Sequence, residues 1–138
     1  VAICSQLMFI AQLQASQAKT QLILLGTGTP NAEPERSGPS LAVVVGDNSY
    51  IVDFGPGVVR RATKFSKQWG GFTALNPENL KVAFLTHLHS DHTVGYSDLI
   101  LTPWVLGRDV PLEVYGPKGL TEMTELIIEA YKKDIDYR

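Results

Sequence analysis

Short apolar runs alternate along this chain with polar segments rich in glycine, proline and serine. The apolar runs are residues 21–25, 41–45, 50–53, 81–85 and 111–115. Short runs of this kind, bounded by turn-forming residues, predict β-strands. The first run is almost wholly apolar, which predicts a buried strand. Residues 46–49 (Gly-Asp-Asn-Ser) join the second and third runs and predict a hairpin turn.

Helices are predicted between the later strands. The predicted helices are residues 56–65, 93–101 and 119–133. Gly55-Pro56 is typical of a helix start, and Pro103 is expected to end the second helix before it. Apolar residues recur at helical spacing in the third helix and predict a stripe packed on the core. Those residues are Leu120, Met123, Leu126, Ile127, Ala130 and Tyr131. Residues 66–79 are expected to form a loop, with room for one helical turn at 77–80.

The order of these elements is strand, hairpin, helix, strand, helix, strand, helix. Interleaved strands and helices predict an α/β layered fold. The 138 residues are one domain's worth or less, and the net charge of −2 does not favour a nucleic-acid partner. The small basic cluster at residues 60–67 is interpreted as a solvated helix face. The single cysteine, Cys4, excludes an intramolecular disulfide.

The first 18 residues have the pattern of a secretion signal. Residues 1–13 are largely apolar and uncharged, and Ser16-x-Ala18 follows as a small-x-small cleavage pattern. The apolar run is short for a membrane span. We therefore expect residues 1–18 to be a signal peptide, with a periplasmic or secreted product and no stable membrane insertion after processing. The alternative is a buried first helix or an amphipathic cap on a cytoplasmic protein.

All three histidines of the chain fall within one run of six residues, directly after a predicted strand. The run contains His87, His89, Asp91 and His92. Residues at i and i+2 of an extended segment point to the same side, so His87 and His89 can converge on one metal. Asp91, at a favoured N-cap position, and His92 turn toward a neighbouring point. Imidazole and carboxylate are typical ligands of divalent transition metals, and the spacing offers two ligands to each of two metals. A surface His/Asp cluster or a structural ion site is the alternative.

Three other patterns are not interpreted as sites. Gly26-x-Gly28 lacks the third glycine of a dinucleotide loop and the Gly-Lys-Ser/Thr ending of a phosphate-binding loop. Ser90 is excluded as a nucleophile because the neighbouring histidines are committed to metal. Trp104 is expected to pack at the core or its rim, with a substrate contact as the alternative.

Several segments together resemble the N-terminal half of a metallo-β-lactamase superfamily hydrolase. Within that superfamily the chain is most similar to the ribonuclease Z-like branch, which includes arylsulfatase-like and phosphodiesterase relatives. The segments that carry the resemblance are Leu-Gly-Thr-Gly-Thr-Pro at 25–30, Arg-Ser at 36–37, Ile-Val-Asp-Phe-Gly at 51–55, the histidine run with its strand at 84–92, and Val-Tyr-Gly-Pro-Lys-Gly at 114–119. Together they span about residues 21–131.

The resemblance implies half of an αβ/βα sandwich with two Zn²⁺ ions at one edge. His87 and His89 would take the first zinc, and Asp91 and His92 the second, with Asp91 also the candidate catalytic residue. Asp53 would lie behind the ligands and accept an imidazole N–H. A carboxylate that only caps the turn before Gly55 is the alternative role for Asp53.

The family's second half supplies further ligands, but no histidine follows His92 in this chain. Residues 19–138 are therefore expected to be a metallo-β-lactamase-like domain truncated at its C-terminus, inactive alone and with an apolar face exposed. The long arm of transfer-RNA-processing members is also absent.

The function expected for the intact protein is zinc-dependent hydrolysis of phosphodiester or sulfate esters by water that the metals activate. A small-molecule ester is the expected substrate, because an exported protein is poorly placed to mature transfer RNA. Nucleic acid is a less favoured partner, and a homodimer is left open. The alternatives are a catalytically incomplete metal-binding or interaction fragment, and a lactone or β-lactam hydrolase of the same superfamily.

Overall fold

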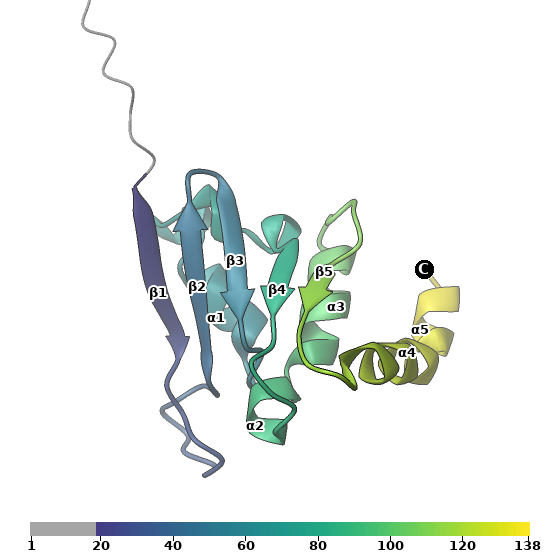
Figure 1. Cartoon of the computed structure of the whole chain (residues 1–138). Coiled ribbons are helices and arrows are strands. Elements are labelled where there is room, and N and C mark those ends of the chain that lie inside the picture. The colour runs from purple at the N-terminus through teal and green to yellow at the C-terminus, as the bar shows by residue number, and fades with distance from the viewer. Residues whose placement is uncertain (1–18) are drawn as a thin grey trace, which may run out of the picture.

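The structure is a computed structural model that describes residues 19–138, so Cys4 and the predicted signal peptide lie outside it. One five-stranded sheet organises the described chain (Figure 1). Its strands are β1 (Thr20–Gly26), β2 (Ser40–Val45), β3 (Asn48–Val52), β4 (Val82–Phe84) and β5 (Glu113–Tyr115), adjacent in chain order. β1, β2 and β3 are antiparallel neighbours, whereas β3, β4 and β5 run parallel.

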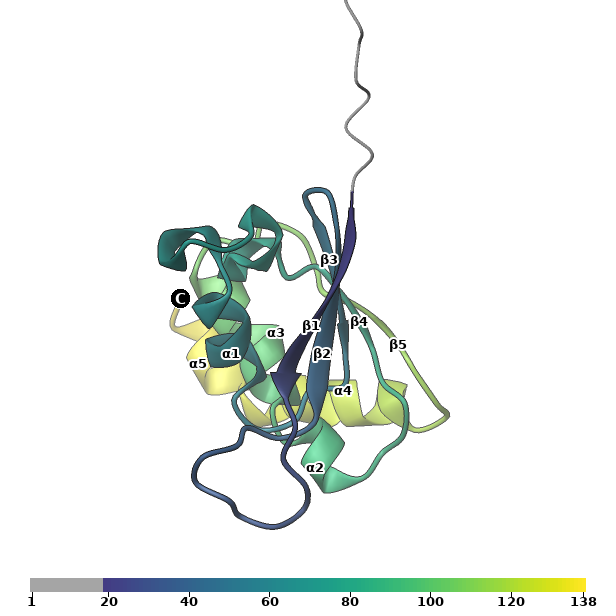
Figure 2. The same cartoon turned by 90° about the vertical axis from the view of Figure 1, so that its left-hand side faces the viewer.

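The helices cover one face of this sheet (Figure 2). They are α1 (Val58–Lys64), α2 (Ser90–Thr93), α3 (Tyr96–Val105), α4 (Leu120–Ala130) and α5 (Lys132–Asp136). Three 3₁₀ turns follow α1: η1 (Lys67–Trp69), η2 (Thr73–Leu75) and η3 (Pro77–Asn79). The first two lie in the segment predicted as a loop, and η3 confirms the helical turn predicted at residues 77–80. The predicted α/β layered architecture is confirmed. None of the helices in residues 19–138 has the length and apolar character needed to cross a membrane.

The core lies between the sheet and the helices. Alternate strand positions point inward, as the two-residue period of a strand requires. The buried apolar residues of strands and helices include Leu25, Ala42, Val44, Ile51, Ala83, Val58, Ala62, Tyr96 and Leu99. The rings of Phe54 and Tyr96 pack with centroids 4.8 Å apart beneath the end of β3. This packing fixes the N-terminus of α3 against the C-terminal edge of the sheet.

The opposite face of the sheet is apolar and open. One row of side chains paired across all the strands runs along it: Leu24, Leu41, Val52, Phe84 and Tyr115. Leu24 is 58% exposed and Tyr115 is 53% exposed, and no helix among residues 19–138 covers them (Figure 2). The exposed apolar face expected of half a sandwich is therefore present. The prediction that the first strand is buried is wrong, because β1 is an edge strand whose outer side chains face this open side.

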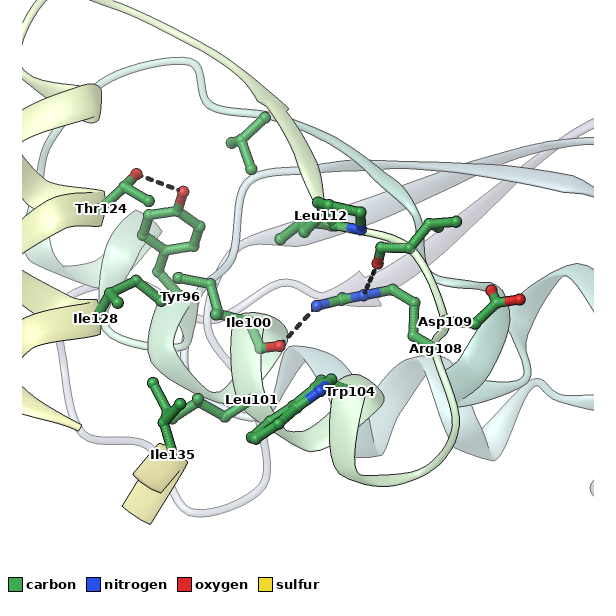
Figure 3. A pocket seen from close by; sticks show the side chains of 13 residues that line it. Tyr96, Ile100, Leu101, Trp104, Arg108, Asp109, Leu112, Thr124, Ile128 and Ile135 are labelled. Atoms are coloured by element: carbon green, nitrogen blue, oxygen red, sulfur yellow. Dashed lines mark hydrogen bonds between the residues drawn. The ribbon is translucent and has the colours of Figure 1, made fainter. Parts of the chain in front are cut away.

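The second predicted helix does not stop before Pro103, since α3 continues to Val105. A proline in a helix lacks the N–H that would bond the carbonyl four residues earlier. That carbonyl, Leu99 O, instead accepts a hydrogen bond of 3.0 Å from Nη1 of Arg108. Arg108 is 5% exposed and also donates to Leu80 O, Ile100 O and Val110 O (Figure 3). Burial lowers the pKa of the Arg108 guanidinium from its usual value.

Replacing Arg108 by methionine is expected to destabilise the fold by about 3 kcal/mol. Each buried carbonyl left without a donor costs about 1 kcal/mol or more, and the apolar stem is retained. Urea unfolding followed by circular dichroism measures the change. Arg60→Met is the matched control, because Arg60 is 82% exposed and its 3.5 Å ion pair with Asp98 is worth less than about 1 kcal/mol. Equal stability of the two variants would contradict this role of Arg108.

The third predicted helix is divided, with α4 ending at Ala130 and α5 following. Its apolar stripe is only partly core. Leu120 is buried, and Met123 and Ile127 pack partly against the core. Leu126 is 64% exposed, so the prediction that the whole stripe packs inward is wrong. The reason is that α4 lies beyond β5 at the end of the sheet, where few elements of the described chain can cover it (Figure 1).

Candidate metal centre

The predicted ligands lie where two parallel strands end. Val52 of β3 pairs with Phe84 of β4, so the residues that follow the two strands are neighbours. The backbone N–H of Asp53 donates to Phe84 O at 2.8 Å and extends this pairing by one step. Side chains at the carboxyl ends of parallel strands meet at one edge of the sheet, where α/β proteins commonly build sites. Asp53 and the histidine run are thereby brought together across more than thirty residues of sequence.

α2 holds the second part of the histidine run against the end of β3. Phe54 donates its backbone N–H to His92 O at 2.9 Å, and Phe54 O accepts the N–H of Gly95 at 2.8 Å. The N-cap position of α2 is His89, in an extended conformation. Asp91 lies in the first turn of α2 and makes no capping hydrogen bond, so its predicted N-cap position is wrong. Its carboxylate is left available for other partners.

The structure brings the four predicted ligands into contact. The ring centroids of His87 and His92 are 4.2 Å apart, and those of His87 and His89 are 4.5 Å apart. The carboxylate Oδ2 of Asp91 lies 3.6 Å from Nε2 of His92. Three imidazoles and one carboxylate thus lie in contact with one another, and their role as metal ligands stays a prediction.

Asp53 lies directly behind this cluster and is 8% exposed. It has a φ of 60°, in the left-handed region that aspartate adopts more readily than most residues. Its Oδ2 accepts a 2.8 Å hydrogen bond from Nδ1 of His92, and its Oδ1 accepts one of 2.8 Å from the backbone N–H of Thr86. Asp53 therefore makes the imidazole contact that the sequence predicts, and it also ties β3 to the segment after β4. Its role at a metal stays a prediction.

The donor set of the cluster fits zinc in its chemistry. With Nδ1 bonded to Asp53, Nε2 is the nitrogen of His92 left for a metal. Two ligand atoms, each about 2.0–2.1 Å from a tetrahedral zinc, lie about 3.4 Å from each other. The 3.6 Å between Asp91 Oδ2 and His92 Nε2 agrees with such a pair. Within residues 19–138 no group of three or more His, Cys, Asp and Glu is already arranged to hold a metal ion, so the spacing argument rests on the pair of Asp91 and His92.

A cavity of about 620 Å³ lies elsewhere, between α3, β5, α4 and α5 (Figure 3). Its lining is mainly apolar and includes Tyr96, Trp104 and Leu112, but no residue of the histidine cluster. The Tyr96 hydroxyl is 2.7 Å from Thr124 Oγ1 on its wall, and burial raises the pKa of Tyr96. Trp104 is 38% exposed and lines this cavity, in agreement with its expected packing at the rim.

Sequence reasoning assigned no role to Thr86, which the structure places between Asp53 and His87. The hydroxyl of Thr86 is 2.9 Å from Asp53 Oδ1 and 2.9 Å from Nδ1 of His87. The only signal in the sequence was a residue with a hydroxyl group directly before the first histidine. That signal is not sufficient, because the contact also requires Asp53, which is distant in the sequence.

Comparison with known proteins identifies relatives of this chain. The profile of the Metallo-beta-lactamase superfamily matches residues 34–130. Ribonuclease Z of Mycobacterium marinum is 38% identical over 121 residues, which are 86% of this chain and 40% of that protein. Ribonuclease Z of Mycobacterium avium shows the same identity and coverage. The chain thus spans about 40% of the length of these relatives.

Solved structures show the same fold. The human short-form tRNase Z superposes with a TM-score of 0.67 at 26% identity, over 80% of this chain and 39% of that one. A long-form RNase Z from yeast superposes with a TM-score of 0.68 at 20% identity, over 88% of this chain and 17% of that one. The expected half of a metallo-β-lactamase sandwich and the resemblance to ribonuclease Z-like members are confirmed. Because the superfamily profile matches residues 34–130, which are most of this chain, the chain belongs to the metallo-β-lactamase superfamily.

Proposed function

We propose that this chain is the part of a metal-dependent hydrolase that holds the metals, and that the enzyme cleaves phosphodiester bonds in RNA. One observation carries the proposal: the three histidines and Asp91 are in contact at the carboxyl ends of β3 and β4, with Asp53 bonded behind them. A surface cluster without a function would not need a buried carboxylate in a left-handed conformation at its base.

His87, His89, Asp91 and His92 are the residues that would hold the metal, and zinc suits this set of nitrogen and oxygen donors. Bound there, the metal would lower the pKa of a water molecule and stabilise charge on the reacting oxygens. The chain's own contribution is orientation. Asp53 fixes the ring of His92, and the short helix α2 presents Asp91 beside it.

The substrate class rests on the relatives. Two relatives that are 38% identical in sequence carry the name Ribonuclease Z, and a structural neighbour is a tRNase Z. These names favour an RNA phosphodiester over the small-molecule ester expected from the sequence. The net charge of −2 means that attraction for RNA must come from local groups rather than from the whole chain. Sulfate esters and lactones stay as alternative substrates.

A chimera tests the proposal. Residues 21–131 of this chain would replace the matching segment of the Mycobacterium marinum ribonuclease Z, which supplies the remaining length. We expect the zinc-loaded chimera to hydrolyse bis(p-nitrophenyl) phosphate and to cleave a precursor transfer RNA. We expect no comparable rate on p-nitrophenyl sulfate or a chromogenic β-lactam.

The same chimera with His89→Ala is the control, and its rate should fall at least about 1,000-fold because a direct ligand is lost. Circular dichroism and zinc content establish that both chimeras are folded and loaded. A folded, zinc-loaded chimera that hydrolyses the sulfate ester faster than the phosphodiester, or that keeps its rate without His89, would contradict the proposal.

A further inference from the structure

The side chain of Thr86 lies between a carboxylate and a candidate ligand. Its Oγ1 lies 2.9 Å from Oδ1 and 3.0 Å from Oδ2 of Asp53, and 2.9 Å from Nδ1 of His87. The backbone N–H of the same residue donates to Asp53 Oδ1 at 2.8 Å. Thr86 therefore touches Asp53 through two groups and His87 through one.

A threonine hydroxyl has one proton to donate and can accept through its oxygen lone pairs. A carboxylate only accepts, so the proton of Thr86 must point to Asp53. The lone pairs of Oγ1 then face His87, and a short contact with Nδ1 is favourable only if Nδ1 carries a proton. In the opposite arrangement the Thr86 proton would point to His87. The lone pairs of Oγ1 would then face both carboxylate oxygens of Asp53, which lie 2.9 and 3.0 Å away, and would repel them.

A protonated Nδ1 leaves Nε2 of His87 with a free lone pair. In His92 the Nδ1–H donates directly to Asp53 Oδ2 at 2.8 Å and leaves Nε2 free as well. The hydrogen bond at one ring nitrogen decides which nitrogen of a histidine can bind a metal. One carboxylate is thus connected to two candidate ligands, one directly and one through a hydroxyl.

We propose that Thr86 is a positioning residue that relays the Asp53 carboxylate to His87, so that Asp53 sets the tautomers of His87 and His92 together and presents both Nε2 atoms to the metal. This inference rests on the proposed metal site. Thr86 donates its proton to Asp53 and accepts the Nδ1–H of His87, and it does not itself bind the metal.

Nuclear magnetic resonance of the metal-free 138-residue chain tests the relay directly. The chain has only three histidines, so the long-range ¹H–¹⁵N spectrum contains only three imidazole rings to assign. We expect His87 and His92 to be Nδ1-protonated. In Thr86→Val, His87 should lose this preference while His92 keeps it. In Thr86→Ser, which retains the hydroxyl, both should remain Nδ1-protonated.

Thr86 is exposed, so the valine variant is expected to fold, and the unchanged His92 signal reports that Asp53 is still in place. Zinc affinity gives a second measurement. It should fall about 10- to 100-fold in Thr86→Val and recover in Thr86→Ser.

An Nε2-protonated His87 in the unmodified chain, or a His87 tautomer that Thr86→Val leaves unchanged, would overturn the relay. Because the tautomers are read without metal or substrate, the relay can fail while the chimera is active, and the chimera can fail while the relay holds. If Thr86→Val does not fold, the serine variant still decides: a His87 that loses its tautomer preference in Thr86→Ser contradicts a role for the hydroxyl.

Discussion

Asp53→Asn is expected to lower the zinc affinity of the chain about 100-fold, at the upper end of what the loss of a residue behind the ligands usually costs. The carboxylate bonds His92 directly and contacts the hydroxyl that faces His87, so one substitution releases two candidate ligands. Asparagine tolerates the left-handed conformation that Asp53 adopts, with its φ of 60°. The loss is therefore expected without unfolding. Competition with a chromophoric chelator measures the affinity.

Asp47→Asn is the matched control, because Asp47 lies exposed in the turn between β2 and β3, away from the cluster. Its zinc affinity should equal that of the unmodified chain. If Asp53→Asn also binds zinc with unchanged affinity while folded, Asp53 is only a turn-forming carboxylate. That outcome would support the alternative role that the sequence left open.

Gly55→Ala is expected to displace α2 and to cost about 3 kcal/mol or more of folding free energy, because overpacking of this kind costs about 1–3 kcal/mol or occasionally more. A Cβ on Gly55 would lie 2.5 Å from the carbonyl carbon of Gly38, 2.7 Å from the nitrogen of Pro39 and 2.7 Å from Asp91 O. All of these are backbone atoms, which cannot turn aside as a flexible side chain can. Zinc affinity should fall together with stability, because Asp91 belongs to the segment that must move.

Gly70→Ala separates this steric effect from the conformational cost of losing a glycine. Gly70 has a φ of 83°, and a Cβ added there would meet nothing within 4 Å. Only the left-handed conformation is therefore penalised, by about 1–2 kcal/mol. Its zinc affinity should not change. Urea unfolding of both variants gives the two free energies, and a Gly55→Ala variant as stable as Gly70→Ala would show that α2 is not tightly packed on the end of β3.

The strands could be predicted from the sequence wherever an apolar run is bounded by turn-forming residues. The hairpin of β2 and β3 follows from two such runs and the turn between them, and the strand before the histidines follows from its apolar run, although its pairing with the distant β3 does not. The exposure of the outer side chains of β1 could not be predicted, because it depends on which elements lie across the open face of the sheet. The continuation of α3 through Pro103 could not either, since the carbonyl that proline leaves free is taken by the side chain of Arg108.

The candidate ligands could be predicted because all of them lie in one short run after a strand, where spacing alone brings them together. The connection to Thr86 could not, because it requires the parallel pairing of β3 with β4 and the positive φ of Asp53. Spacing predicts which side chains gather. The hydrogen bonds that orient them depend on tertiary structure.

Metal binding through imidazole nitrogen is the property on which the proposed function and the Thr86 relay both depend. X-ray absorption spectroscopy of the 138-residue chain loaded with one equivalent of Zn²⁺ tests this most directly. We expect the scattering pattern of at least two imidazoles, with Zn–N distances of about 2.0–2.1 Å, and a weaker pattern in His92→Ala. A spectrum with oxygen ligands alone, or one that His92→Ala leaves unchanged, would contradict metal binding by these histidines.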